Sequence, residues 1–146
     1  MTKEISAEAR DIAVRVETFV RDKIFAYEKD DRCEDHGPTD GLVQEMRVLA
    51  REAGVLTPHI REDGSHLTHL ETALVLRKSG LSPLGPLAVN TFAPDEGNMY
   101  LLGKCASPEQ KDHFLAPLVS GEARSAFFMT EPASENGAGS DPMMMQ

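Results

Sequence analysis

The chain has 146 residues, a formal net charge of −9 and only two cysteines, and this length suits one domain with a single core. The acidic balance argues against a nucleic-acid partner, because neutralising phosphates needs clustered Lys and Arg that this sequence lacks. No run of residues reaches the roughly 18 apolar positions that span a bilayer. The polar N-terminus resembles neither a signal peptide nor a transit peptide, so we expect a cytoplasmic protein with reduced thiols.

Helical periodicity dominates the first third of the chain. Apolar residues spaced by three and four predict a helix from Ser6 to about Asp30, with Ser6 as its N-cap. The polar stretch 30–38 ends in Gly-Pro and breaks this helix. A second helix is predicted from Thr39 to Ala53, with Gly54 at the left-handed cap. The predicted buried stripes are Ala9, Ile12, Val16, Phe19, Val20, Ile24 and Tyr27 in the first helix, and Leu42, Val43, Met46, Leu49 and Ala50 in the second.

Shorter helices are predicted in the middle of the chain. A loop over 55–65 leads to a helix over 67–78, and a connector over 82–86 leads to a helix over 87–92. Asp95 is then predicted to cap a helix that ends at Cys105. The apolar positions are Leu70, Ala73, Leu74 and Leu76 in the first of these helices, and Met99, Leu101 and Leu102 in the last.

The clearest helix start is Ser107-Pro-Glu-Gln110, with Ser at the N-cap, Pro at the first helical position and Gln able to reach back to the cap amide. This helix carries Phe114, Leu115, Leu118 and Val119 and ends at Ser120-Gly121. Residues 124–130 then predict a strand, and 131–139 a loop. The expected fold is all-α, an orthogonal or up-down bundle of about six helices with one C-terminal strand and loop. A single strand has no partner for its backbone, so we expect it to be the edge of a larger sheet or a frayed end.

Five short motifs follow one another in the last third of the chain: Ser107-Pro-Glu-Gln-Lys111, Phe114-Leu-Ala-Pro-Leu118, Ser120-Gly-Glu122, Phe127-Phe-Met-Thr-Glu-Pro132 and Gly139-Ser-Asp141. In this order and spacing they resemble the acyl-CoA dehydrogenase family. His36-Gly-Pro38 and Ala50-Arg-Glu-Ala-Gly54 are similar to its bacterial, long-chain branch. The resemblance implies that residues 1–121 form the family's N-terminal helical domain and that 122–146 begin its middle β-domain, which is incomplete here.

The resemblance also implies FAD as the cofactor. Carried over to this sequence, Phe127, Met129, Thr130, Gly139 and Ser140 would contact FAD, and Ser140 would also approach the acyl-CoA substrate. Fixed main-chain donors at a flavin stabilise the negative charge that develops when it accepts hydride. The spacer between the last two motifs, residues 133–138, is longer than is usual in the family.

The family reaction is α,β-dehydrogenation of an acyl-CoA thioester, an oxidoreductase step of fatty acid metabolism. A glutamate of the C-terminal helical domain acts as base, and electrons leave to an electron-transfer flavoprotein. The resemblance therefore implies no catalytic residue within these 146 residues and a chain that is inactive alone, from an enzyme that forms a dimer or tetramer. The alternatives are a non-catalytic helical subunit that docks onto a separate flavoprotein, and a plain helical bundle with a chance motif. Only the plain bundle predicts no exposed apolar face.

Other patterns suggest weaker sites. Cys33-x-x-His36 and His66-x-x-His69 could pair at a zinc ion, but both lie in loops or at helix starts without a Cys-rich context, so we expect no metal. The acidic run 30–35 lacks the glycine and register of a calcium loop. Gly137-x-Gly139 does not open a helix, so it predicts no dinucleotide site.

Overall fold

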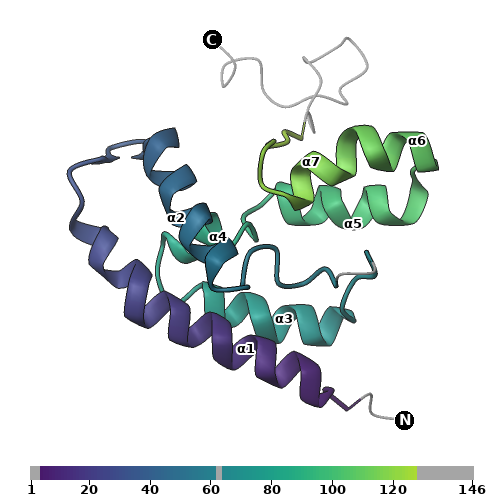
Figure 1. Ribbon diagram of the computed structural model, residues 1–146, viewed down its shortest axis with the longest axis horizontal. Coiled ribbons are helices and arrows are strands. Elements are labelled where there is room, and N and C mark those ends of the chain that lie inside the picture. The colour runs from purple at the N-terminus through teal and green to yellow at the C-terminus, as the bar shows by residue number, and fades with distance from the viewer. Residues whose placement is uncertain (1–3, 62–63, 128–146) are drawn as a thin grey trace, which may run out of the picture.

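The computed structural model describes residues 4–61 and 64–127. Apart from one short hairpin, the regular structure of these residues is helical, which confirms the expected all-α class. In Figure 1, α1 (Ala7–Phe19) lies beside α3 (His69–Ser79), while α2 (Asp40–Glu52) and α4 (Gly85–Ala88) pack together above them. The later helices, from α5 (Asp95–Cys105) onward, form a separate layer, and the chain continues from the end of this layer after α7. Among the helices of the described residues, none is long and apolar enough to cross a membrane.

The first predicted helix is present as a continuous helical rod whose winding changes. Regular α1 passes into a π-helical turn, η1 (Val20–Ile24), and then a 3₁₀ turn, η2 (Phe25–Lys29). Ser6 is the N-cap as predicted, since its Oγ accepts from the Ala9 amide at 3.2 Å. The predicted stripe is the core face: Ala9, Val16, Phe19, Val20 and Ile24 are buried, and Ile12 and Tyr27 are partly buried.

The polar stretch after this rod interrupts the helices as expected, but it contains a hairpin that periodicity did not indicate. β1 (Cys33–Glu34) pairs antiparallel with β2 (Gly37–Pro38). Thr39 then caps α2, and Gly54 follows that helix at φ +65, the left-handed conformation expected of a glycine cap. Both predicted ends of the second helix are therefore confirmed to within one residue.

The third helix buries other positions than its apolar residues Leu70, Ala73, Leu74 and Leu76, of which Leu74 packs partly buried against the core. α3 starts at His69 because Thr68 and Glu71 form a capping box, each side chain bonding the other's backbone. Leu70 is half exposed, and the inward positions instead carry Glu71, Thr72, Val75 and Ser79. The hydroxyls of Thr72 and Ser79 on this face donate to nearby backbone carbonyls. These short side chains let a neighbouring backbone approach closely. A Cβ added at Gly85 would lie 2.0 Å from the Ser79 carbonyl oxygen.

Two predictions in the middle of the chain also need correction. The helix expected over 87–92 is the shorter α4, which starts two residues earlier because Pro86 is tolerated in a first turn. It cannot continue, since Asn90 has φ +58. α5 has its predicted bounds, but Pro94 occupies the N-cap and Asp95 does not cap the helix. The Asp95 carboxylate is used elsewhere, as described below.

The last predicted helix is confirmed, with its Ser107 cap and the reciprocal Gln110 bond. It runs through α6 (Pro108–Gln110), the π-helical turn η3 (Lys111–Leu115) and α7 (Ala116–Val119), and Gly121 ends it at φ +74. Of the strand expected over 124–130, residues 124–127 form no strand, because Ser125 bonds to α5 instead of to a neighbouring strand. The remainder of that strand and the loop over 131–139 lie outside the described residues.

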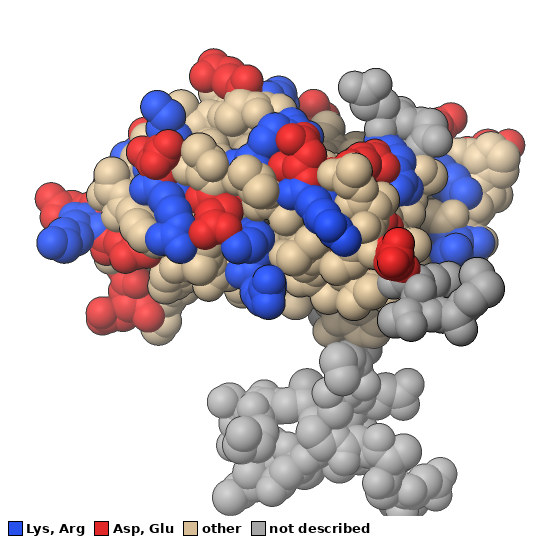
Figure 2. All heavy atoms as spheres, turned by 90° about the horizontal axis from the view of Figure 1, so that it is seen from below, with Lys and Arg blue, Asp and Glu red and all other residues tan. Residues whose placement is uncertain are grey.

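The outer face of α1 is charged and carries both signs. Figure 2 shows Lys and Arg interspersed with Asp and Glu over the face that lies at the bottom of Figure 1. Pairs such as Arg15–Asp11, Arg21–Glu17 and Lys78–Glu17 account for this mixture. This face therefore offers no continuous basic patch for a phosphate backbone.

Candidate functional site

Residues 121–127, which we call the exit segment, carry the chain away from the helical layers toward the predicted cofactor-binding motif. Asp95, at the start of α5, holds this segment: its Oδ1 accepts from the Ser125 amide at 2.6 Å and from the Ser125 hydroxyl at 2.7 Å. Asn98, one turn along α5, donates to the same hydroxyl at 2.8 Å. Arg124 adds a longer ion pair to Asp95, at 3.8 Å. The direction in which the chain leaves the domain is thus set by charge-assisted hydrogen bonds.

A buried arginine anchors the other end of the exit segment. Arg47 of α2 is 1% exposed, and its Nη1 donates to the Gly121 carbonyl at 2.8 Å. Its Nε donates to the Leu87 carbonyl at 3.2 Å and its Nη2 to Asn90 Oδ1 at 2.9 Å. Burial lowers the pKa of Arg47 and the charge of Asp95 opposes that effect, yet a guanidinium remains protonated in proteins. The charged guanidinium therefore donates to three neutral acceptors, and these hydrogen bonds connect α2, the α4 region and the exit segment.

Asn90 and Thr57 complete this polar network. Both have positive φ, +58 and +50, and both are buried. Asn90 Nδ2 donates to Thr57 Oγ1 at 2.9 Å and to the Leu118 carbonyl at 2.8 Å, and Thr57 Oγ1 donates to the Val119 carbonyl at 2.6 Å. The end of α7 is therefore tied to the 55–60 loop and to the turn after α4. These hydrogen bonds hold the side chains of Asn90 and Thr57 in place, and they offset the cost of the positive φ at both residues.

An apolar groove of about 400 Å³ lies beside the exit segment, between α5 and the last helix. Three large apolar side chains in this region are half exposed or more: Leu101 at 51%, Phe114 at 52% and Phe127 at 57%. Of the apolar residues of these helices, Met99 and Leu118 are buried, whereas Leu101 and Phe114 are not. A plain helical bundle predicts no such face, so this surface argues against that alternative. The groove is lined by Asn98, Leu101, Leu102, His113, Phe114, Pro117, Leu118, Ala123, Arg124 and Ser125.

Of the five residues predicted to contact FAD, only Phe127 is described. It follows the anchored Ser125 by two residues and stands exposed near the apolar groove. Its contact with FAD stays a prediction. Met129, Thr130, Gly139 and Ser140 lie outside the described residues, so their contacts stay predictions.

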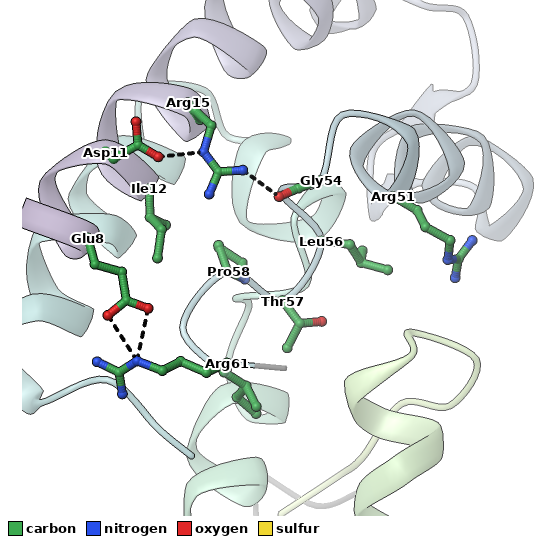
Figure 3. Close-up of a pocket in the computed structure, with 11 residues that line it drawn as sticks. Glu8, Asp11, Ile12, Arg15, Arg51, Gly54, Leu56, Thr57, Pro58 and Arg61 are labelled. Atoms are coloured by element: carbon green, nitrogen blue, oxygen red, sulfur yellow. Dashed lines mark hydrogen bonds and ion pairs between the residues drawn. The ribbon is translucent and has the colours of Figure 1, made fainter. Parts of the chain in front are cut away.

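A larger hollow, of about 750 Å³, lies between α1 and the loop that follows α2 (Figure 3). Three arginines border it, but each has a partner. Arg15 bonds Asp11 and the Gly54 carbonyl, as Figure 3 shows, and Arg61 bonds Glu8. Arg51 donates to the Ser120 carbonyl at 2.7 Å. This basic rim therefore joins structural elements and is a poor site for an anionic ligand.

The Cys33–His36 and His66–His69 pairs considered for zinc do not form one cluster among the described residues. His66 lies instead against His59, with ring centroids 5.2 Å apart, and its Nε2 is 3.5 Å from Glu96 Oε1. Neither partner stood out in the sequence: His59 lies in a loop and Glu96 in the first turn of a helix. The same holds for Arg47, which occupies an ordinary position within α2. Only Asp95 carried a local signal, and that signal indicated a helix cap.

Comparisons with known proteins identify the family. Residues 6–122 match the model of the acyl-CoA dehydrogenase N-terminal domain. The chain is 35% identical over 136 residues to the probable acyl-CoA dehydrogenase FadE2 of Mycobacterium tuberculosis, an alignment that covers 88% of this chain and 33% of that protein. It is 28% identical over 133 residues to the human acyl-CoA dehydrogenase family member 11, covering 86% of this chain and 17% of that protein.

A solved structure agrees with these matches. A protein from Mycobacterium abscessus that is described as an acyl-CoA dehydrogenase superposes with a TM-score of 0.70 at 29% identity. The match covers 91% of this chain and 36% of the other. The chain thus spans about a third of the length of the two mycobacterial proteins and less than a fifth of the length of the human protein.

Proposed function

Since the chain belongs to the acyl-CoA dehydrogenase family through its N-terminal helical domain, we propose that it supplies the helical layer of an FAD-dependent enzyme that introduces the α,β double bond of an acyl-CoA. The anchored exit segment carries this proposal. Bonds from Arg47, Asp95 and Asn98 hold residues 121–125, so the backbone that follows starts from a fixed point beside an apolar groove. Positioning of this kind is what a cofactor site requires of its protein scaffold.

The proposed role of the segment after Phe127 is to present main-chain groups and the Thr130 hydroxyl to the flavin. Bound FAD would accept the hydride from the β-carbon of the substrate. The chain's own contribution is orientation and exclusion of water. Because Ser125 is held by two bonds to one carboxylate, little reorganisation of the exit segment is needed when the cofactor or substrate arrives.

The apolar groove is the proposed contact surface for the rest of the enzyme. Leu101 and Phe114 expose more than half of their surface, and burying such residues stabilises an interface by about 25 cal/mol per Å² of apolar area. We propose that a middle β-domain begins at residue 122 and covers this face, and that the complete enzyme is a homo-oligomer that passes electrons to an electron-transfer flavoprotein. The glutamate base would come from the C-terminal helical domain of the family, so these 146 residues alone would not turn over an acyl-CoA.

A chimera tests this proposal directly. The N-terminal segment of the Mycobacterium tuberculosis relative would be replaced by residues 1–122 of this chain, and flavin content and acyl-CoA-dependent reduction of an electron-accepting dye would be measured. We expect the chimera to be yellow and active, and the 146-residue chain to be colourless and inactive with FAD added. An Asp95→Leu chimera is the matched variant and should bind less flavin. A folded chimera without flavin, or stoichiometric flavin on the 146-residue chain, would refute the proposal.

A further inference from the structure

We propose that His59, His66 and Glu96 form a binding site for a divalent transition-metal ion of the zinc type. His59 and His66 lie in the loop between α2 and α3, and Glu96 lies in the first turn of α5. One ligand atom from each lies within 4.8 Å of the others. Two imidazoles and one carboxylate are a common ligand set for zinc, with the remaining position open to water or another ligand. From the sequence we expected no metal, because the residues considered as ligands there were Cys33, His36, His66 and His69.

The state of His59 is the first observation behind this site. Its side chain is 0% exposed, and among the described residues both ring nitrogens lack a hydrogen-bond partner. A buried polar group without a partner costs about 1–3 kcal/mol, so such groups in native proteins call for an explanation. Since neither ring nitrogen has a partner among the described residues, the imidazole has a lone pair available for a metal.

The orientation of His66 is the second observation. Its Nδ1 lies 2.8 Å from the Leu67 carbonyl oxygen, and because a carbonyl only accepts, Nδ1 carries the proton. This leaves Nε2 unprotonated in the neutral ring, on the side of Glu96 at 3.5 Å. A backbone carbonyl that holds the far nitrogen of an imidazole is the usual outer-shell arrangement of a metal-bound histidine. Tyr100 supports the ring from its edge, with centroids 5.0 Å apart.

Geometry and access agree with a small ion. Zinc bonds of about 2.0–2.1 Å place two ligand atoms roughly 3.4 Å apart. Since no pair of ligand atoms is more than 4.8 Å apart, each pair must close by at most about 1.4 Å, and His66 Nε2 and Glu96 Oε1 already lie 3.5 Å apart. Side-chain rotation of Glu96, which keeps 24% of its side-chain surface exposed, supplies such a movement. A hollow of about 420 Å³ adjoins His66 and gives an ion a route from solvent. The bound ion would pin the 57–67 loop to α5, whose first residue holds the exit segment.

The test titrates the 146-residue chain with Zn²⁺ by calorimetry and with Co²⁺ by visible absorption. We expect one ion per chain. Replacement of an outer-shell partner typically weakens metal binding 10–100-fold, so His59→Gln, His66→Gln and Glu96→Gln should each weaken binding at least about tenfold. The matched controls are His69→Gln, which faces the same hollow, and His36→Gln on the hairpin; both should bind Zn²⁺ as the parent does.

A measurement on the unmodified chain covers the case in which a variant fails to fold. In NMR spectra, Zn²⁺ should shift the ring nitrogens of His59 and His66 and leave those of His36 unchanged. The absence of saturable binding, or an equal loss of affinity in His69→Gln, would overturn the assignment. Unshifted rings of His59 and His66 would do so as well, and would mean that His59 is simply a buried neutral histidine.

Discussion

Replacing Arg47 with methionine should strongly destabilise the domain and release the exit segment. Arg47→Met keeps most of the apolar stem but leaves the Gly121 carbonyl and Asn90 Oδ1 without the Arg47 donor, and removes one of the donors to the Leu87 carbonyl. Unpaired buried acceptors cost about 1–3 kcal/mol each, whereas removing a buried charge returns part of its desolvation cost. We expect a net loss of about 3–5 kcal/mol, close to the range for breaking a buried charged contact.

Urea denaturation followed by circular dichroism measures this loss. With a slope of about 2 kcal/mol per M, the midpoint should fall by about 1.5–2.5 M. Arg51→Met is the matched control, because Arg51 lies on the same helix, is exposed and, within the described residues, donates to the Ser120 carbonyl alone. The loss of stability in this variant should stay below about 1 kcal/mol. Hydrogen exchange should also become faster at residues 121–125 in Arg47→Met alone. Equal midpoints for the two variants would show that the buried network does not hold the domain together.

Three further changes test other parts of the structure. Gly85→Ala should destabilise by more than about 2 kcal/mol, because the new Cβ would lie 2.0 Å from the Ser79 carbonyl; a thermal midpoint near the parent's would contradict this contact. Hydrogen bonds from Ser6, and then from Thr68, lower the pKa of Glu71 from 4.5 to about 2, so its stabilising effect is complete above about pH 4.5 and is lost as the pH falls through about 2. Glu71→Gln should therefore flatten the acid limb of a stability–pH curve, and an unchanged limb would rule this contact out as its source. Phe114→Ser should reduce the self-association that we expect from the uncovered groove, measured by light scattering, and a monomeric parent chain would refute the expectation.

Local signals predicted the helices well wherever the deciding atoms were close in sequence. Ser6 and Ser107 cap helices as predicted, and Gly54 and Gly121 have the left-handed φ that ends them. The helix α3 shows the limit of periodicity. Its apolar positions indicated one face, but packing against α1 buries the face of small polar residues whose hydroxyls bond within their own turn.

The candidate site could be recognised only in part. The motifs around residues 107–141 led to the family, which the comparisons confirm, and Phe127 is exposed at the end of the anchored segment. No local pattern singles out Arg47, because its acceptor on Gly121 is 74 residues away. Asp95 was assigned to a helix cap since a cap needs only neighbouring amides, whereas its true partner, Ser125, lies 30 residues further on.

The amino-acid sequence by itself determined the all-α class, most helix ends and the family, because capping, periodicity and ordered motifs depend on residues within a few positions of one another. Tertiary structure alone decided which side chains meet: Arg47 with the exit segment, and His59 with His66 and Glu96. These contacts depend on how helices pack, and packing sums many weak, non-local interactions that no short stretch of sequence contains.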